Sequence, residues 1–113
     1  QIAGYFFFFF LSKEWAEDQK IPSVREIAVL MEVNPNTAMR AYTFLQEKDI
    51  IYNKRGIGYF VSASGFDKAL AMRRDEFFKK EVPQVFRTMV LLNAGCAELE
   101  ASFQTYLSNQ TKP

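Results

Sequence analysis

The sequence predicts a mainly α-helical domain that carries one small β-hairpin and continues into further helices. Apolar residues recur at helical spacing through most of the chain, helix-capping signals precede two of the helical segments, and two β-prone runs flank a Gly-containing stretch near residue 56. The 113 residues are 49% hydrophobic and 24% charged. This composition suits one small packed domain with an appendage.

The composition excludes several kinds of site. With no His and a single Cys, Cys96, the chain can form no internal disulfide, no Cys/His zinc site and no His-based catalytic triad. We therefore expect no metal and no cofactor. One thiol is typical of a reducing, cytoplasmic setting. The longest apolar run, Tyr5 to Leu11, is far shorter than the about 20 residues of a membrane-spanning helix. Because the chain opens at Gln1 inside an apolar pattern, we expect natural residues to precede it.

Residues 1–19 form the first predicted helix, because apolar side chains fall at roughly helical spacing from Ile2 to Trp15. The run Phe6–Phe10 is unusual, since neighbouring residues on a helix are about 100° apart and five rings cannot share one face. Two interpretations remain open. The run is excess apolar surface on a core helix, or its rings are buried against a partner subunit.

Two capped helices follow. Ser23-Val24-Arg25-Glu26 is a capping box that opens a helix from Ser23 to about Glu32. Asn34 is a good N-cap and Pro35 suits the first helical position, so the next helix should run from Pro35 to about Lys48. The expected buried stripe of this helix is Ala38, Ala41, Tyr42 and Leu45. Two helices joined by a short turn form a helix-turn-helix.

A hairpin is predicted directly after these helices. The β-prone runs Ile50–Asn53 and Tyr59–Val61 flank Lys54–Gly58, in which two glycines supply the backbone freedom that a hairpin tip needs. A helix-turn-helix followed by a hairpin with a basic tip is a winged helix-turn-helix. We assign residues 1–62 to this domain.

Residues 63–113 are predicted to form a helical dimerisation tail. Pro83 lacks a backbone donor, so we expect a kink or break near Glu81 to Pro83. A last helix should begin at Cys96. About 50 residues can hardly enclose a metabolite-sized cavity of about 300 Å³. The large apolar residues expected at a dimer interface are Phe66, Leu70, Phe77, Phe78, Phe86 and Phe103. The alternative is that these side chains fold back on the chain's own first helix.

The positions of polar residues indicate function better than the net charge of +1. Asn36, Thr37 and Arg40 lie off the buried stripe in the first two turns of the predicted third helix. In helix-turn-helix proteins that part of the helix enters the major groove. Arg can read guanine and Asn can read adenine there, while Thr serves either a phosphate or a base. These residues are therefore the candidate base-reading residues.

Further candidates would contact the DNA backbone. Ser23 and Arg25 open the preceding helix, where free amides could face a phosphate. Lys54 and Arg55 at the hairpin tip could reach the backbone or a narrow minor groove, and should govern the salt dependence of binding. Structural alternatives stand beside these. Asn34 is better explained as a cap than as a DNA contact. Arg25, taken alone, could be an ordinary solvent-exposed residue of its helix.

Three stretches resemble the GntR family of transcription regulators. Ile21–Ala28 resembles the family's "LPSxRELA" opening, Val33–Tyr42 its "VNxNTVxRAY" recognition helix, and Leu45–Val61 its "LExxGLIxxxxGxGxFV" wing. The short helical tail resembles the YtrA-like subgroup, in which the tail serves dimerisation. Two features depart from the family pattern. Glu32 stands where the family usually has Gly, and the Phe run replaces an ordinary amphipathic helix.

The resemblance implies a winged helix that binds a palindromic operator as a two-fold dimer. It implies DNA contacts at positions that match Arg25, Asn34, Asn36, Thr37, Arg40, Arg55 and Gly56. The first hypothesis is thus a sequence-specific transcription regulator that acts as a dimeric repressor in the bacterial cytoplasm, with double-stranded DNA and a second copy as partners. No membrane partner is expected, and the sequence does not indicate which small-molecule effector, if any, the regulator binds.

Two other classes of function are alternatives to this hypothesis. The alternative to a regulator is a winged helix used for protein–protein interaction without sequence-specific DNA binding. The absence of acidic residues among the candidate contacts favours DNA. An enzyme is disfavoured, because the chain offers no nucleophile with a base, no paired carboxylates on one face and no phosphate-cradling Gly loop.

Overall fold

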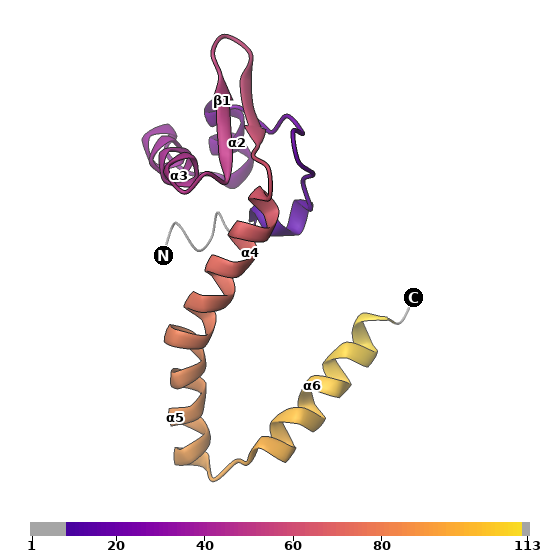
Figure 1. Ribbon diagram of the computed structural model, residues 1–113. Coiled ribbons are helices and arrows are strands. Elements are labelled where there is room, and N and C mark those ends of the chain that lie inside the picture. Colours follow the sequence, from indigo (N-terminus) through magenta and orange to yellow (C-terminus); the bar gives the residue numbers. More distant parts are fainter. Residues whose placement is uncertain (1–8, 112–113) are drawn as a thin grey trace. The chain divides into compact units, whose positions relative to one another are not determined.

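Figure 1 shows a computed structural model, which describes residues 9–111. The chain forms two compact units that meet between Asp75 and Glu76. The first unit contains a helical turn at residues 9–13, then α2 (Val24–Met31), α3 (Pro35–Glu47), β1 (Ile51–Lys54), β2 (Gly58–Val61) and α4 (Gly65–Glu76), whose last residue belongs to the second unit. The second contains the π-helical segment η1 (Phe77–Glu81), α5 (Val82–Leu92) and α6 (Cys96–Gln110). The predicted fold class, mainly helical with a hairpin wing, is confirmed.

Both predicted caps are present on α2 and α3. The Ser23 hydroxyl accepts a hydrogen bond from the Glu26 amide at 3.0 Å, and the Ser23 amide donates to the Glu26 carboxylate at 2.8 Å. Asn34 Oδ1 accepts from the Asn36 amide at 2.7 Å, directly before Pro35. These bonds satisfy amides that a helix start leaves without intrahelical partners. The two helices therefore begin where the local sequence predicts.

The core of the first unit lies between the helices and the inner face of the hairpin. The predicted α3 stripe is buried, and it packs with residues of α2, β1, β2 and α4. The buried apolar residues are Phe10, Ile21, Ile27, Ala28, Met31, Ala38, Ala41, Tyr42, Leu45, Ile50, Ile51, Val61 and Ala69. The Tyr42 hydroxyl donates to the Pro22 carbonyl at 2.7 Å, and burial raises the pKa of this hydroxyl above its ordinary value. The bond ties α3 to the segment before α2.

The segment before α2 is not helical throughout, so the prediction of a helix over residues 1–19 is wrong for its second half. The helical turn ends at Lys13, and Glu14 takes a left-handed φ of 51°. Trp15 then packs edge-on against Phe10, with ring centroids 5.4 Å apart. Phe10 is buried, whereas Phe6, Phe7 and Phe8 lie outside the described residues. Trp15 therefore packs on the core although the backbone is no longer helical at this residue. For this reason the apolar spacing in the sequence looks helical beyond the end of the helix.

Residues 18–21 instead run antiparallel to β2 as an additional edge of the hairpin. The Asp18 amide donates to the Val61 carbonyl at 2.8 Å, the Val61 amide donates to Gln19 O at 3.0 Å, and the Ile21 amide donates to Tyr59 O at 3.0 Å. The Tyr52 hydroxyl donates to Asp18 Oδ1 at 2.7 Å and holds the segment across β2. β2 is therefore paired on both sides, with β1 and with residues 18–21.

The first turns of α4 pack against the winged helix-turn-helix. A Cβ at Gly65 would lie 2.3 Å from the Ile50 carbonyl oxygen, so the helix begins in direct contact with the backbone before β1. Lys68 donates from Nζ to the Asp49 carboxylate at 2.8 Å and to the Asp49 carbonyl at 3.2 Å. The Lys68 ammonium holds the pKa of Asp49 below its usual value. The first compact unit thus extends past residue 62, and a functional boundary at 62/63 stays a prediction.

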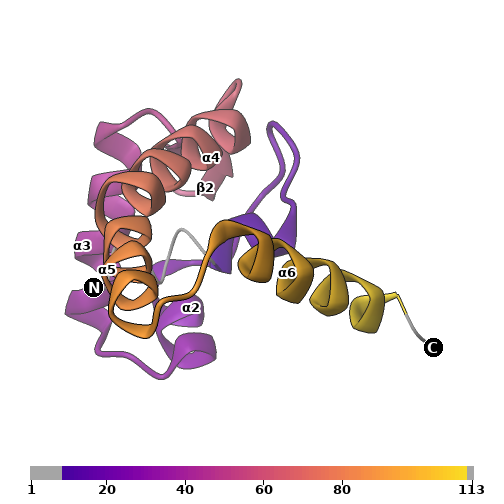
Figure 2. The ribbon, with the colours of Figure 1, turned by 90° about the horizontal axis from the view of Figure 1, so that it is seen from below.

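The second unit contains the irregularity expected near Pro83, in the form of a π-helical turn. The Val82 amide bonds to the Phe77 carbonyl, five residues back, and Pro83 follows in the first turn of α5. A π-turn widens the helix, so the Pro ring avoids the carbonyl that it would meet in a regular α-helix. Figures 1 and 2 show α5 and α6 diverging from the short connection at residues 93–95. Within residues 9–111, no helix has the length and apolar character needed to cross a membrane.

Candidate nucleic-acid interface

The N-terminal half of α3 presents the three candidate base-reading residues outside the core. Asn36 and Arg40 are exposed and Thr37 is half-buried. Ala38, Ala41 and Tyr42, which alternate with them along the helix, are buried. The helix periodicity of 3.6 residues separates the two sets onto different sides. The predicted orientation of this helix is therefore present, with its polar first turns open to a ligand.

The start of α2 presents a second group of candidates. Arg25 is exposed in the first helical turn. Both the amide and the hydroxyl of Ser23 take part in the capping box, and Ser23 is exposed, so a phosphate could approach it at the helix start. Glu26 caps the same turn, and its hydrogen bonds from Ser23 lower the pKa of the Glu26 carboxyl. The cap keeps this carboxylate occupied at the helix start.

Asn34 caps α3 through its side-chain carbonyl oxygen, which is the capping role predicted for this residue. Its side-chain NH₂ group is not needed for the cap. The residue is exposed, like its neighbour Asn36, so a ligand can reach it. One side chain can accordingly hold the helix start and offer a hydrogen bond to a phosphate.

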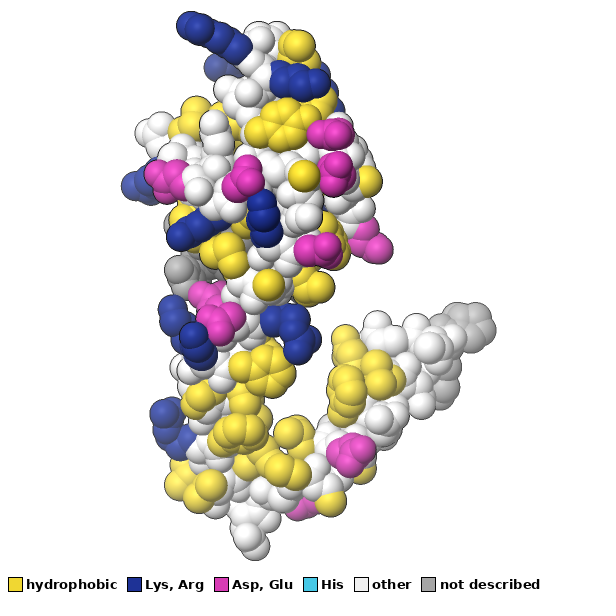
Figure 3. All heavy atoms as spheres, viewed as in Figure 1, with side chains coloured by type: hydrophobic (Ala, Val, Ile, Leu, Met, Phe, Trp, Pro, Cys, Tyr) yellow, Lys and Arg dark blue, Asp and Glu magenta, His cyan; other side chains and the backbone are white. Residues whose placement is uncertain are grey.

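The tip of the hairpin carries the third group. Lys54 is the last residue of β1, Arg55 and Gly56 form the tip, and all three are exposed. Gly56 has a φ of 80°, in the left-handed region that side chains disfavour. Lys54 Nζ lies 4.7 Å from the centroid of the Phe60 ring, a cation–π distance that steadies the side chain. Figure 3 shows Lys and Arg side chains gathered at this end of the first unit.

Sequence reasoning missed Lys20, which joins this group through the edge formed by residues 18–21. Its Cε lies 3.0 Å and its Nζ 3.8 Å from the Cβ position that a side chain would occupy at Gly58. Gly58 pairs with Lys54 across the hairpin. No local motif could reveal this proximity, because it depends on strand pairing between residues that are about 40 positions apart in the sequence.

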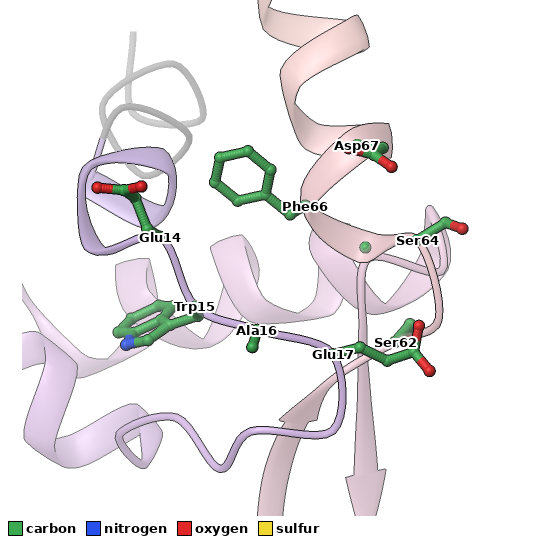
Figure 4. Close-up of a pocket in the computed structure, with 9 residues that line it drawn as sticks. Glu14, Trp15, Ala16, Glu17, Ser62, Ser64, Phe66 and Asp67 are labelled. Atoms are coloured by element: carbon green, nitrogen blue, oxygen red, sulfur yellow. The ribbon is translucent and has the colours of Figure 1, made fainter.

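A recess of about 400 Å³ lies at the joint of residues 14–17 with the start of α4 (Figure 4). The Phe66 ring points into the space between α4 and the helical turn at residues 9–13. Glu14, Glu17 and Asp67 are at its rim. Three carboxylates would repel phosphate, so this side of the first unit does not suit a nucleic acid.

The residues predicted for a dimer interface divide between two environments. Phe66 packs against the core of the first unit, in keeping with the alternative that such residues fold back on their own chain. Leu70, Phe77, Phe78, Phe86 and Phe103 are 40% to 55% exposed. In the second unit, an apolar groove of about 550 Å³ opens between α5 and α6 and is lined by Phe77, Val82, Val85, Phe86, Cys96, Leu99, Glu100 and Phe103. Yellow side chains mark it in Figure 3.

Comparison with known proteins identifies the family. The sequence pattern of "Bacterial regulatory proteins, gntR family" matches residues 10–61. A crystal structure of a putative transcriptional regulator of the GntR family from Bacteroides thetaiotaomicron is 38% identical, with a TM-score of 0.70, and the match covers 98% of this chain and 96% of that one. This chain belongs to the GntR family. The resemblance seen in the three sequence motifs is thereby confirmed.

Two curated relatives come from Bacillus subtilis. The chain is 40% identical over 62 residues to the uncharacterized HTH-type transcriptional regulator YhcF, and 46% identical over 43 residues to the HTH-type transcriptional repressor YtrA. These matches cover 55% and 38% of this chain. The chain spans 51% of the length of the first relative and 33% of the second. The similarity to these two proteins therefore concerns one part of each.

Proposed function

We propose that this GntR-family chain is a sequence-specific DNA-binding transcription regulator and has no enzymatic activity. The observation that carries the proposal is the orientation of α3. Asn36 and Arg40 are exposed and Thr37 is half-buried in its first two turns, while the alternating stripe is sealed in the core. A helix start with donors aimed outward suits the major groove, where such side chains distinguish base pairs. In this proposal Ser23, Arg25, Asn34, Lys54, Arg55 and Gly56 contact the DNA backbone.

A second copy of the chain is the proposed partner of the helical tail. The exposed rings of Phe77, Phe86 and Phe103 line a groove in the second unit, and apolar surface of this kind is characteristic of interfaces. A two-fold dimer would read a palindromic operator, because each protomer supplies one recognition helix. In this arrangement residues 1–62 bind DNA and residues 63–113 hold the copies together.

Repression is the proposed outcome of binding, through occupation of the promoter. The similarity to YtrA, a transcriptional repressor, supports this direction of regulation. Because a regulator of bacterial transcription acts on the chromosome, the proposed location of the chain is the cytoplasm. The effector, if the dimer uses one, has no site assigned in this proposal.

Selection of bound duplexes from a random DNA pool tests the proposal. We expect enrichment of an inverted repeat whose half-sites are one helical turn apart, or a multiple of one turn. The full chain is used, so that the tail is present. Failure to enrich any sequence over the starting pool, with binding no tighter than to bulk DNA, would reject sequence-specific recognition. It would favour a winged helix that meets another protein.

A further inference from the structure

Lys20 lies beside the wing although it precedes the helix-turn-helix in the sequence. Its backbone pairs with Phe60 of β2, and its side chain runs along that strand toward the hairpin tip. Because Gly58 has no side chain, the Lys20 ammonium can approach within 3.8 Å of the position that a Cβ would take. The ammonium is therefore next to the last strand pair, Lys54 with Gly58, before the tip.

The charge of Lys20 also reaches the start of α2. The pKa of Glu26 is lowered chiefly by its hydrogen bonds from Ser23, and in smaller part by the positive charge of Lys20. Glu26 caps the turn that carries Ser23 and Arg25. Lys20 is also only three residues before Ser23 in the chain, while its side chain lies beside Gly58 of the wing, so it connects two groups of candidate phosphate contacts.

We propose that Lys20 is a further DNA-backbone contact, which joins the start of α2 and the wing into one continuous phosphate-binding band. The band consists of Ser23, Arg25, Lys20, Lys54 and Arg55. This inference rests on the proposed DNA-binding function and extends it to a residue outside the helix-turn-helix and the hairpin. A row of cations of this kind can follow the phosphates of one strand, since duplex DNA presents them at regular, short intervals.

The carboxylates of the two acidic residues near Lys20, Glu26 and Asp18, each accept a hydrogen bond from a residue other than Lys20. The Glu26 carboxylate already accepts a hydrogen bond from the Ser23 amide. The Asp18 carboxylate accepts from the Tyr52 hydroxyl, and Tyr52 pairs with Phe60, two residues farther from the tip than Gly58. Lys20 itself is exposed. Its charge is thus presented on the tip side of the sheet, where Lys54 and Arg55 lie.

The test compares Lys20→Gln with the wild-type chain in binding a mixed-sequence DNA duplex and the duplex enriched by selection. Affinity is measured over a series of salt concentrations. We expect Lys20→Gln to weaken both complexes about three- to tenfold and to reduce the slope of log K against log salt by about one, because one phosphate contact is lost. Lys20→Arg should retain the wild-type slope. Lys48→Gln is the matched control, since Lys48 is exposed at the far end of α3 from Asn36.

The outcomes separate the inference from the function on which it rests. Absence of salt-dependent binding by the wild-type chain would reject DNA binding itself. Wild-type affinity and slope in Lys20→Gln would overturn the role of Lys20 alone. An equal loss in Lys48→Gln would also overturn it, by showing an effect of total charge. Thermal unfolding of Lys20→Gln and Lys48→Gln is compared with that of the wild type. A folding defect caused by replacing Lys20 would weaken DNA binding in Lys20→Arg as well, whereas loss of the charge alone would leave Lys20→Arg unaffected.

Discussion

Glu32 shows how a single backbone conformation shapes the helix-turn-helix. It ends α2 with a φ of 54° and ψ of 47°, in the left-handed region. This explains why the family pattern usually has Gly at that position: a side chain there costs about 1 kcal/mol or more. The turn between α2 and α3 is kept, but in this chain it is strained.

Relief of that strain gives the first prediction. Glu32→Gly should raise the free energy of unfolding by about 1 kcal/mol, because Gly adopts the left-handed conformation without a steric penalty. Glu32→Ala is the control, since it removes the same carboxylate and keeps the Cβ. Urea unfolding of the three proteins measures the difference. Equal stabilisation by both variants would trace the effect to the carboxylate and not to the backbone.

Arg40 should act in recognition and not in folding, because its side chain is exposed. Arg40→Ala should lower affinity for the selected operator about 10- to 100-fold, the worth of one bidentate base contact, and leave bulk DNA binding nearly intact. Its unfolding free energy should stay within about 0.5 kcal/mol of the wild type. Gln46→Ala, on the C-terminal half of α3, is the control in gel-shift titrations. A wild-type operator affinity in Arg40→Ala would remove this residue from the site.

Residue-level prediction succeeded where the determinants are local. Ser23 and Asn34 could be recognised as caps because the amides that they accept from are within three residues. The exposure of Asn36 and Arg40 followed from helical periodicity around a buried stripe. Lys20 could not be recognised, because its place beside Gly58 arises from pairing with a distant strand.

At the scale of elements, the sequence predicted α2, α3 and the hairpin within one or two residues of their observed bounds. It failed at residues 14–19, where the apolar spacing continues but the backbone leaves the helix at Glu14. Periodicity reports which side chains are buried and does not report how the backbone brings them there. The π-turn at Phe77–Glu81 was anticipated only as an irregularity near Pro83.

The N-terminus of α3 allows the two roles of Asn34 to be separated. Asn34→Asp keeps the cap acceptor and should leave stability within about 0.5 kcal/mol, whereas Asn34→Ala should cost about 1 kcal/mol. If the Asn34 amide also binds phosphate, Asp should weaken DNA binding more than Ala does, because it adds repulsion to the lost donor. Thermal unfolding and DNA titration of both variants measure this. Weaker DNA binding by Ala than by Asp would assign Asn34 to capping alone.

The junction of α4 with the winged helix depends on Gly65. Gly65→Ala should destabilise the first unit by about 1–3 kcal/mol, because the new Cβ would be 2.3 Å from the Ile50 carbonyl oxygen. That oxygen also accepts from the Ser62 amide at 2.9 Å, so it cannot move freely. Gly95→Ala is the matched control, since nothing lies within 4 Å of its Cβ position. Equal unfolding midpoints for the two variants would contradict this packing.

At the scale of the whole molecule, the two units present different surfaces to different proposed partners. The first has a closed core and exposed polar helix starts, whereas the second unit has exposed rings on η1, α5 and α6. Composition predicted this surplus of apolar groups, but not which of them the chain itself would cover. Phe66 was expected at a partner interface because the tail carries more large apolar side chains than a pair of helices can cover, and in the structure it is partly buried against the core of the first unit.

Introduction of a charge in the groove between α5 and α6 tests the proposed dimer. Phe86→Glu should yield a monomer at micromolar concentration in analytical ultracentrifugation, because a carboxylate in an apolar interface would be desolvated. Affinity for a two-half-site operator should fall by about 100-fold or more as the second recognition helix loses its tether. Gln104→Glu adds the same charge to an exposed position of α6 as the control. A monomeric wild-type chain would refute the dimer directly.

Pairing of residues 18–21 with β2 bears on how the DNA-binding region can be isolated. A fragment designed from the recognisable motif would start at Ile21 and would strip β2 of one neighbour, leaving the Val61 amide without the Gln19 carbonyl. It would also discard Lys20 and the Asp18 anchor for Tyr52. Truncation studies should therefore retain the polypeptide from Phe10 onward, and purification tags belong at the opposite terminus.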